Sequence, residues 1–171
     1  MMKIKRIILI LALGILLVSA FACVGGPEAT PTPTPTPTAG LSIENVEICS
    51  DVRGDRDYTI RGNGIFQLGD RVYVYFEVFG FRVQSTDGKY EVWFKVSNVE
   101  LYDPDDELVL SQADLIDLHS TQLEEVPPYV WAEVHFDIEP GEPAGQYRAE
   151  ITVEDMISGE TASTTGYFTM E

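Results

Sequence analysis

The chain has 171 residues, a formal net charge of −17 and two cysteines. This length suits a single folded domain, and the excess of acidic side chains disfavours nucleic acid and anionic lipid surfaces as direct binding partners. About 130 residues follow the N-terminal segments, which is enough for a sizeable hydrophobic core.

The first 22 residues have the order of a secretory signal. Three basic residues lie within the first six positions, residues 7–18 are apolar, and small residues surround Cys23. The strictly apolar run is shorter than the roughly 20 residues that span a bilayer. If the residues that follow it are counted as well, an uncleaved membrane-spanning helix remains an alternative. We therefore expect residues 1–22 to be a signal or anchor segment that places the rest of the chain outside the cytoplasm.

The segment Ala20-Phe21-Ala22-Cys23 resembles a lipoprotein signal, and the Cys-Val-Gly-Gly that leads into a Thr/Pro spacer is similar to archaeal surface lipoproteins. Ala20 and Phe21 stand where a usual lipobox has Leu and a small residue. The resemblance implies that Cys23 carries a lipid and attaches the protein to the outer face of the cell membrane. Ordinary cleavage after Ala22 would instead release the chain.

Residues 23–40 form a Pro/Thr-rich tether with a strict Pro-Thr repeat at 31–38. Each proline fixes φ and removes an amide donor, so the repeat favours a disordered but semi-rigid polyproline-II linker. At ~3.1 Å per residue its eight residues span roughly 25 Å. The threonines are candidate O-glycosylation sites, and a plain spacer without sugar is the alternative.

From residue 41 onward apolar and polar residues alternate, which is typical of strands buried on one face. The pattern predicts strands at 41–49, 71–81, 90–101, 107–118, 130–138, 145–155 and 161–170, with a possible short strand at 58–60. Shifts in the alternation predict bulges near Asn45 and Asn98. Turns are expected at 68–70, 87–88, 103–106 and 158–159. We expect the segment after the 107–118 strand to be a loop or short helical turn.

Seven or eight short strands separated by turns indicate an all-β domain over residues 41–171, an antiparallel β-sandwich. The closing pattern that runs from Pro143 through Tyr147 to Met170 resembles the last two strands of immunoglobulin-like extracellular domains. Leu68-Gly69-Asp70 resembles the entry to their second strand. The resemblance implies an immunoglobulin-like sandwich without an inter-sheet disulfide, and it carries over no functional residue.

The alternation predicts inward-facing residues on three strands, which are Val72, Val74, Phe76 and Val78, then Val92, Phe94 and Val96, and then Tyr147, Ala149, Ile151 and Val153. Glu77 and several large aromatic side chains are predicted on the opposite, outward faces. Exposed aromatic rings can stack on sugars or anchor a protein partner. The candidate partner-binding residues are Tyr73, Tyr75, Phe79, Trp93 and Trp131. The alternative is that segment 50–64 or segment 103–128 folds over these rings and buries them.

Acidic residues also cluster in one turn, at Asp103, Asp105, Asp106 and Glu107. Calcium prefers closely spaced carboxylate and carbonyl oxygens, so this turn is a candidate metal site. Its spacing does not match a twelve-residue calcium loop, and a solvated turn is the alternative.

The remaining metal-ligating side chains form no recognisable set. Cys49 is expected to be a small buried residue of the first strand, unless it pairs with Cys23. His119 is expected in a loop and His135 at an outward strand position.

No catalytic motif and no cofactor-binding pattern occur in the sequence. We expect a non-enzymatic binding or accessory module at the cell surface, with an unknown protein or carbohydrate partner. The alternative is an inhibitor of extracytoplasmic proteases that acts through loop 51–64 or loop 120–128. A third hypothesis is a hydrolase without a recognisable motif.

Overall fold

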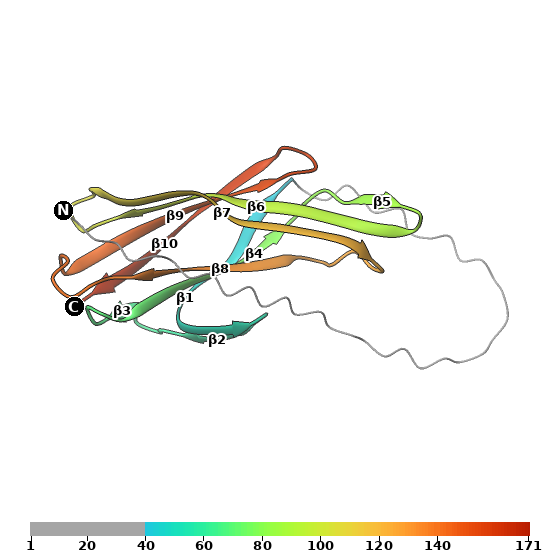
Figure 1. Ribbon diagram of the computed structural model, residues 1–171. Coiled ribbons are helices and arrows are strands. Elements are labelled where there is room, and N and C mark those ends of the chain that lie inside the picture. The colour runs from blue at the N-terminus through green and yellow to red at the C-terminus, as the bar shows by residue number, and fades with distance from the viewer. Residues whose placement is uncertain (1–39) are drawn as a thin grey trace.

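The computed structural model describes residues 40–171, which fold into two β-sheets that face each other (Figure 1). The all-β prediction is confirmed. Within this described range no helix has the length and apolar character needed to cross a membrane. The predicted leader, Cys23 and the tether lie outside the described residues.

The first sheet, sheet A, has the strand order β2-β1-β4-β8, and all its neighbours are antiparallel. Its strands are β1 (Ser42–Gly54), β2 (Asp57–Ile60), β4 (Arg71–Phe79) and β8 (Val130–Asp137).

The second sheet, sheet B, has the order β3-β10-β9-β6-β5, and β7 also pairs with β6. Its strands are β3 (Ile65–Phe66), β5 (Gln84–Thr86), β6 (Lys89–Tyr102), β7 (Leu108–Leu123), β9 (Gly145–Asp155) and β10 (Thr161–Met170). Residues 40–171 contain ten strands instead of the predicted seven or eight, because short pieces of the connections also pair. The prediction of purely antiparallel pairing is wrong for β3, which runs parallel to β10.

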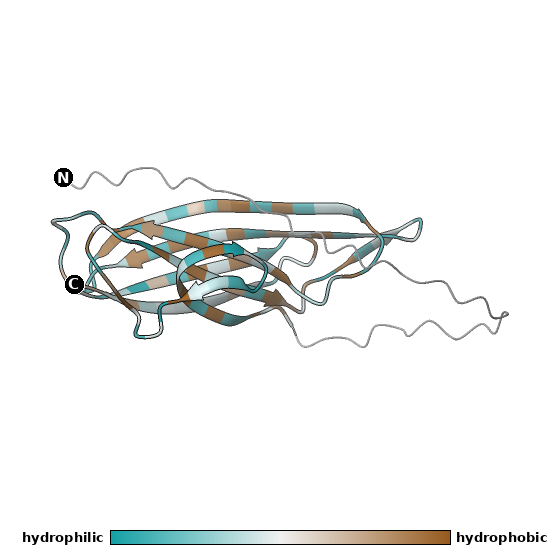
Figure 2. Ribbon diagram, turned by 90° about the horizontal axis from the view of Figure 1, so that it is seen from below, coloured by the Kyte–Doolittle hydropathy of each residue, from teal (hydrophilic) through white to brown (hydrophobic). Residues whose placement is uncertain are grey.

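The core lies between the two sheets and comes mainly from alternate residues of the longer strands. Hydrophobic and hydrophilic positions alternate along most ribbons in Figure 2. The predicted inward residues of β4 (Val72, Val74, Phe76 and Val78) are fully buried. Their counterparts in sheet B include Phe94, Val96, Ile151 and Val153, which are also fully buried. Strand periodicity therefore identified the inner face correctly.

The two predicted bulges are present. Asn45 has a positive φ of 49°, and the pairing of β1 with β4 shifts between Glu44 and Glu47. The pairing of β6 with β7 and with β9 shifts between Val96 and Asn98. Each bulge inserts a residue and increases the local twist of its strand.

Segment 107–123 differs from the prediction. It forms one long strand, β7, which pairs with β6 along its whole length and contains no helical turn. Positive φ angles at Asp114 and Gln122 interrupt its alternation. These two irregularities disturb the period that a sequence pattern relies on, so the part of the strand beyond residue 118 was predicted as a loop or short helical turn.

Strand β1 belongs to two different pairings. Its first half, up to Cys49, pairs with β4, and its second half pairs with β2. Beyond Cys49 the strand turns away from β4 and carries β2 with it, as Figures 1 and 2 show. The resulting β1–β2 hairpin folds over the outer face of sheet A.

Candidate functional site

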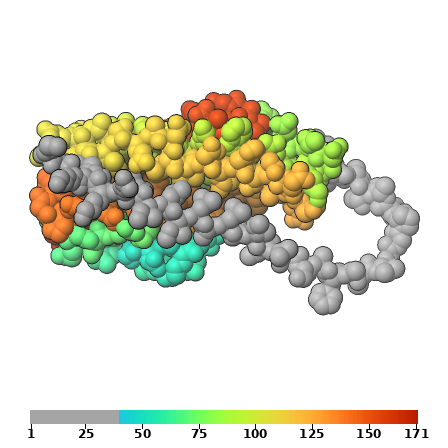
Figure 3. All heavy atoms as spheres, in the orientation of Figure 1, coloured from blue at the N-terminus to red at the C-terminus, as the bar shows by residue number. Residues whose placement is uncertain are grey.

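The predicted aromatic residues do not form one site. Trp93 lies on the outer face of sheet B, because its neighbours Val92 and Phe94 point into the core. The other four belong to the outer face of sheet A, and they are Tyr73, Tyr75, Phe79 and Trp131. The β1–β2 region and the β7 region form opposite margins of the domain in Figure 3.

The β1–β2 hairpin covers part of the outer face of sheet A. Tyr75 is 0% exposed, so its prediction as an exposed binding residue is wrong. The Tyr58 ring from β2 lies 4.6 Å from the Tyr75 ring, and Trp131 stacks on Tyr75 at 5.8 Å. The alternative that segment 50–64 folds over the aromatic face is therefore correct for Tyr75. Tyr73, Phe79 and Trp131 remain half-buried.

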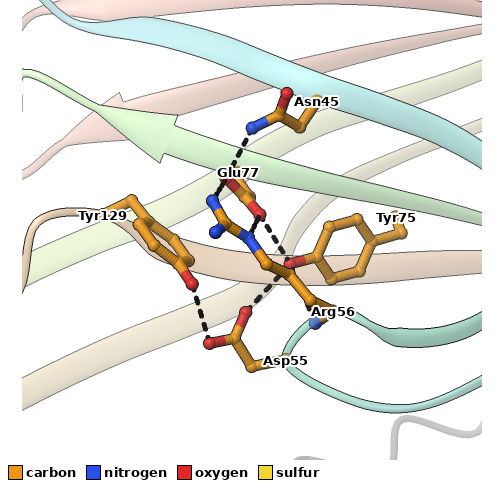
Figure 4. A network of polar contacts seen from close by, with 6 residues as sticks. All are labelled: Asn45, Asp55, Arg56, Tyr75, Glu77 and Tyr129. Carbon is orange, nitrogen blue, oxygen red and sulfur yellow. Dashed lines mark hydrogen bonds and ion pairs between the residues drawn. The ribbon is translucent and has the colours of Figure 1, made fainter.

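A buried carboxylate fastens this hairpin to the sheet (Figure 4). Glu77 is 1% exposed, and Arg56 at the hairpin tip donates two hydrogen bonds to its oxygens, at 2.7 and 2.8 Å. The Asn45 amide donates a further bond of 2.7 Å from the bulge of β1. The Arg56 guanidinium beside Glu77 holds the pKa of this carboxyl below its usual range. Glu77 is thus ionised and its oxygens are occupied, which suits a structural clamp better than proton transfer.

The hairpin tip makes a second set of contacts beside the first. The Tyr129 hydroxyl donates to Asp55 at 2.9 Å, and the Arg56 guanidinium lies 4.5 Å from the centre of the Tyr129 ring. The Tyr75 hydroxyl lies 3.1 Å from an oxygen of Asp55 and 3.1 Å from one of Glu77. It has a single proton, so it can donate to only one of these carboxylates at a time. The tip is therefore tied to β4 and to the segment before β8.

This clamp was missed at the sequence level. The strand period placed Glu77 on an outward face, which is correct, but an outward charge is normally solvated. The available signal was a single acidic residue in an otherwise apolar and aromatic strand. The arginine that pairs with it lies 21 positions earlier in the chain, and no local pattern connects the two.

The clamp also bears on the hypothesis that loop 51–64 inhibits proteases. Residues 51–60 form strand and turn, and their polar side chains are engaged with one another and with sheet A. Arg53 pairs with Asp51 and Asp57 within the hairpin itself. Segment 51–60 therefore offers little free loop to insert into a protease cleft.

Next to the clamp lies a second polar row on the same face. In register across the sheet, Cys49 pairs with Tyr73, and Tyr73 pairs with His135. The Cys49 thiol is 0% exposed and forms no disulfide with a described residue, and burial raises its pKa to about 11. His135, predicted to point outward, does so but is only 4% exposed. Burial lowers the pKa of its imidazole.

Glu133 occupies the next outward position of β8 and pairs in register with Tyr75. Burial raises the pKa of the Glu133 carboxyl to about 7, the charge of Asp51 adds to this rise, and Arg71 opposes it. One oxygen of Glu133 and the Nε2 atom of His135 are buried without a hydrogen-bond partner in the described part of the chain. Neither residue was selected from the sequence as a site residue.

The outer face of sheet B carries an accessible aromatic pair. Trp93 and His119 are cross-strand partners on β6 and β7, and their rings stack with centres 4.7 Å apart. The indole N–H of Trp93 donates to Asp117 at 2.7 Å, and the Nε2 atom of His119 lies 2.6 Å from a Glu91 oxygen. The His119 side chain is 42% exposed. We call Trp93, His119, Glu91 and Asp117 the Trp93 platform.

His119 was expected in a loop, and that expectation is wrong. It lies in the second half of β7, directly opposite Trp93. The sequence could not show this neighbour, because the pairing of β7 with β6 brings together residues 26 positions apart.

The acidic turn has local partners for its carboxylates. An oxygen of Asp103 accepts the backbone N–H groups of Asp105 and Glu107, both at 2.9 Å. Asp106, which has a positive φ of 61°, accepts a bond of 2.6 Å from Arg148. Across residues 40–171 no group of three or more His, Cys, Asp or Glu side chains is arranged to hold a metal ion. These contacts agree with the solvated-turn alternative.

Neither a protein-family model nor a curated protein matches the chain. Solved structures with a similar backbone include the alkylpurine DNA glycosylase AlkC of Pseudomonas fluorescens bound to DNA, with a TM-score of 0.42 and 9% identity over 78% of this chain. A family 123 glycoside hydrolase from Clostridium perfringens has a TM-score of 0.46 and 10% identity over 77% of this chain. The chain covers 31% and 27% of those two proteins, respectively.

Proposed function

We propose that this protein is a cell-surface-anchored, non-enzymatic binding module of the immunoglobulin-like class, and that the Trp93 platform is its binding face. The anchoring part rests on the secretory pattern of residues 1–22, on Cys23 and on the Pro-Thr tether. In this arrangement the tether holds the sandwich away from the outer face of the membrane, where its faces can meet a protein or carbohydrate partner.

One contact supports the immunoglobulin-like class in particular. The Tyr147 hydroxyl, near the start of β9, donates a 2.8 Å hydrogen bond to the carbonyl oxygen of Pro143, four residues upstream. Immunoglobulin-like sandwiches commonly have a tyrosine that bonds back to upstream backbone at this kind of corner. The closing β9–β10 hairpin follows it, as the sequence resemblance implies.

The main support for the binding proposal is that the Trp93 ring is already held in place before a partner binds. Its hydrogen bond to Asp117 and its stacking on His119 hold the ring in one orientation on a solvent-facing sheet. Less side-chain entropy is then lost when a partner binds. An aromatic face beside two carboxylates can stack on a ring and accept hydrogen bonds from hydroxyl or amide groups.

The test compares binding of the purified mature chain and its variants to envelopes of the source cells and to arrays of glycans and proteins. Trp93→Ala is expected to weaken binding at least about tenfold, as loss of an aromatic anchor usually does. Tyr167→Ala is the matched control, since Tyr167 is 54% exposed on the outer face of the same sheet. Its binding should equal that of the wild type.

Two outcomes would contradict the assignment. Unchanged binding by a folded Trp93→Ala variant would remove the platform from consideration. Loss of binding by Trp131→Ala alone would move the binding face to sheet A.

A further inference from the structure

The outer face of sheet A contains two kinds of buried polar group. Glu77 is buried and accepts several hydrogen bonds. An oxygen of Glu133 and the Nε2 atom of His135 are buried without a partner among residues 40–171. Buried polar groups without partners are rare in folded proteins, because they give up their bonds to water and receive nothing in return.

The β1–β2 hairpin crosses this face from β1 to the segment before β8, where Asp55 at its tip binds Tyr129. Glu133 and His135 are two positions apart on β8, so both point to the outer face of sheet A. Glu133 is close enough to Asp51, in the second half of β1, for the two charges to interact. Since β8 itself is an edge strand, its outer face would be open to water without a covering segment.

The surroundings of Glu133 are acidic. The titratable and charged groups that act on this cluster are Glu47, Cys49 and Asp51 from β1, Tyr58 from β2, Arg71, Tyr73 and Tyr75 from β4, and Asp137 from β8. Arg71 is the basic side chain among them, and it already pairs with Asp137. A negative charge on Glu133 would therefore lack a free cation next to it.

We propose that the β1–β2 hairpin is a pH-sensitive cover, which stays shut while Glu133 is protonated and loosens from sheet A when that carboxyl ionises. A protonated carboxyl tolerates this half-buried site, whereas a carboxylate there would have one oxygen without water or a partner and would lie near Asp51. Loosening admits water to both unpartnered groups and exposes Tyr75 and Cys49.

The range of pH follows from the two titrating groups. Ionisation of Glu133, with its pKa of about 7, sets the upper limit. On the acid side, burial and the charge of Arg71 keep the pKa of His135 below its ordinary value, so this imidazole stays neutral under mildly acidic conditions. The cover is expected to be tightest between these limits. The device is independent of the Trp93 platform, which lies on the opposite sheet.

Cys49 provides a natural probe of opening, because it is 0% exposed on the covered face. The rate at which a maleimide labels Cys49 is measured on the full chain, and peptide masses separate this label from one on Cys23. Each rate is divided by that of the urea-unfolded chain at the same pH, which removes the intrinsic titration of the thiol. The normalised rate of the wild type should rise at least about tenfold between about pH 5.5 and about pH 8.5.

Two variants complete the experiment. Glu133→Gln keeps the shape of the protonated carboxyl, so its normalised rate should stay low at both pH values. Glu154→Gln changes a carboxylate on β9, away from the cover, and should reproduce the wild-type rise.

The proposal is overturned if the wild-type rate does not change with pH, or if Glu133→Gln shows the same rise as the wild type. It is also overturned if labelling at the higher pH depends on urea as steeply as global unfolding does, because a local opening exposes little surface and depends on urea weakly.

Discussion

At the scale of single residues, the structure contains two ion pairs of the same geometry that differ in burial. Arg56 binds Glu77, and Arg71 binds Asp137, in each case through Nε and Nη2. The Glu77 side chain is 1% exposed, and that of Asp137 is 40% exposed. Because water competes for the exposed pair and not for the buried carboxylate, the two should contribute differently to stability.

Glu77→Gln is expected to lower the free energy of unfolding by roughly 1–3 kcal/mol, because a neutral amide cannot accept all the bonds that the carboxylate receives. Asp137→Asn, the matched control, should cost less than about 1 kcal/mol. Urea unfolding of both variants at neutral pH measures the difference. Equal losses would show that burial of Glu77 adds nothing to its interactions.

The same clamp should make the domain sensitive to acid. The pKa of Glu77 is lower in the folded state than in the unfolded chain, so its contribution is complete above about pH 4.5 and is lost as the pH falls through the folded value. The stability difference between the wild type and Glu77→Gln is therefore expected at pH 6 and should shrink as the pH falls below 4.5 and through the folded-state pKa of Glu77. A difference that persists in strong acid would mean that the charge of Glu77 is not its source.

At the scale of elements, the close contact of β10 with β1 and β4 holds the two sheets together. Gly166 lies in β10, and a Cβ atom on it would stand 3.1 Å from Ile48 and 3.6 Å from Val74 of the opposite sheet. This position has no side chain of its own, which lets the side chains of sheet A approach the backbone of sheet B. This contact lies next to the point where β1 leaves β4, because the curl of β1 begins one residue after Ile48.

Gly166→Val should therefore separate the sheets locally and lower the free energy of unfolding by about 1–3 kcal/mol, the usual cost of overpacking. Gly54→Val is the control, since a Cβ at Gly54 would meet nothing within 4 Å. Thermal or urea unfolding distinguishes the two. If both substitutions had the same effect, the loss would come from the β-strand backbone and not from the contact between sheets.

At the scale of the whole molecule, the two outer faces differ in how far they are covered. One is covered by a hairpin and fastened through a buried carboxylate, while the other presents the Trp93 platform to solvent. Since the chain carries a strong negative charge, a basic or neutral partner fits either face better than an acidic one. An N-terminal anchor would also limit the partner to molecules within reach of the tether.

The anchor itself is tested by the intact mass of the mature protein from its native membrane. We expect a chain that begins at Cys23 and carries a lipid, with Cys49 unmodified until the domain is unfolded. An unlipidated chain cut after Ala22 would instead indicate a secreted protein, and the search for partners would move to the medium.

The sequence by itself determined the all-β class, the inward residues of β4, β6 and β9, and the bulges at Asn45 and Asn98. These features depend on strand period and turn chemistry, which are local properties of the chain. The same pattern also placed Tyr75, Glu77 and His135 on an outward face. Only the tertiary structure decided that this face is covered, since the cover depends on a curl of β1 and on a contact between Arg56 and Glu77, far apart in sequence. The pairing of Trp93 with His119 arose in the same way, because the neighbours of a strand are chosen by long-range contacts and not by its own alternation.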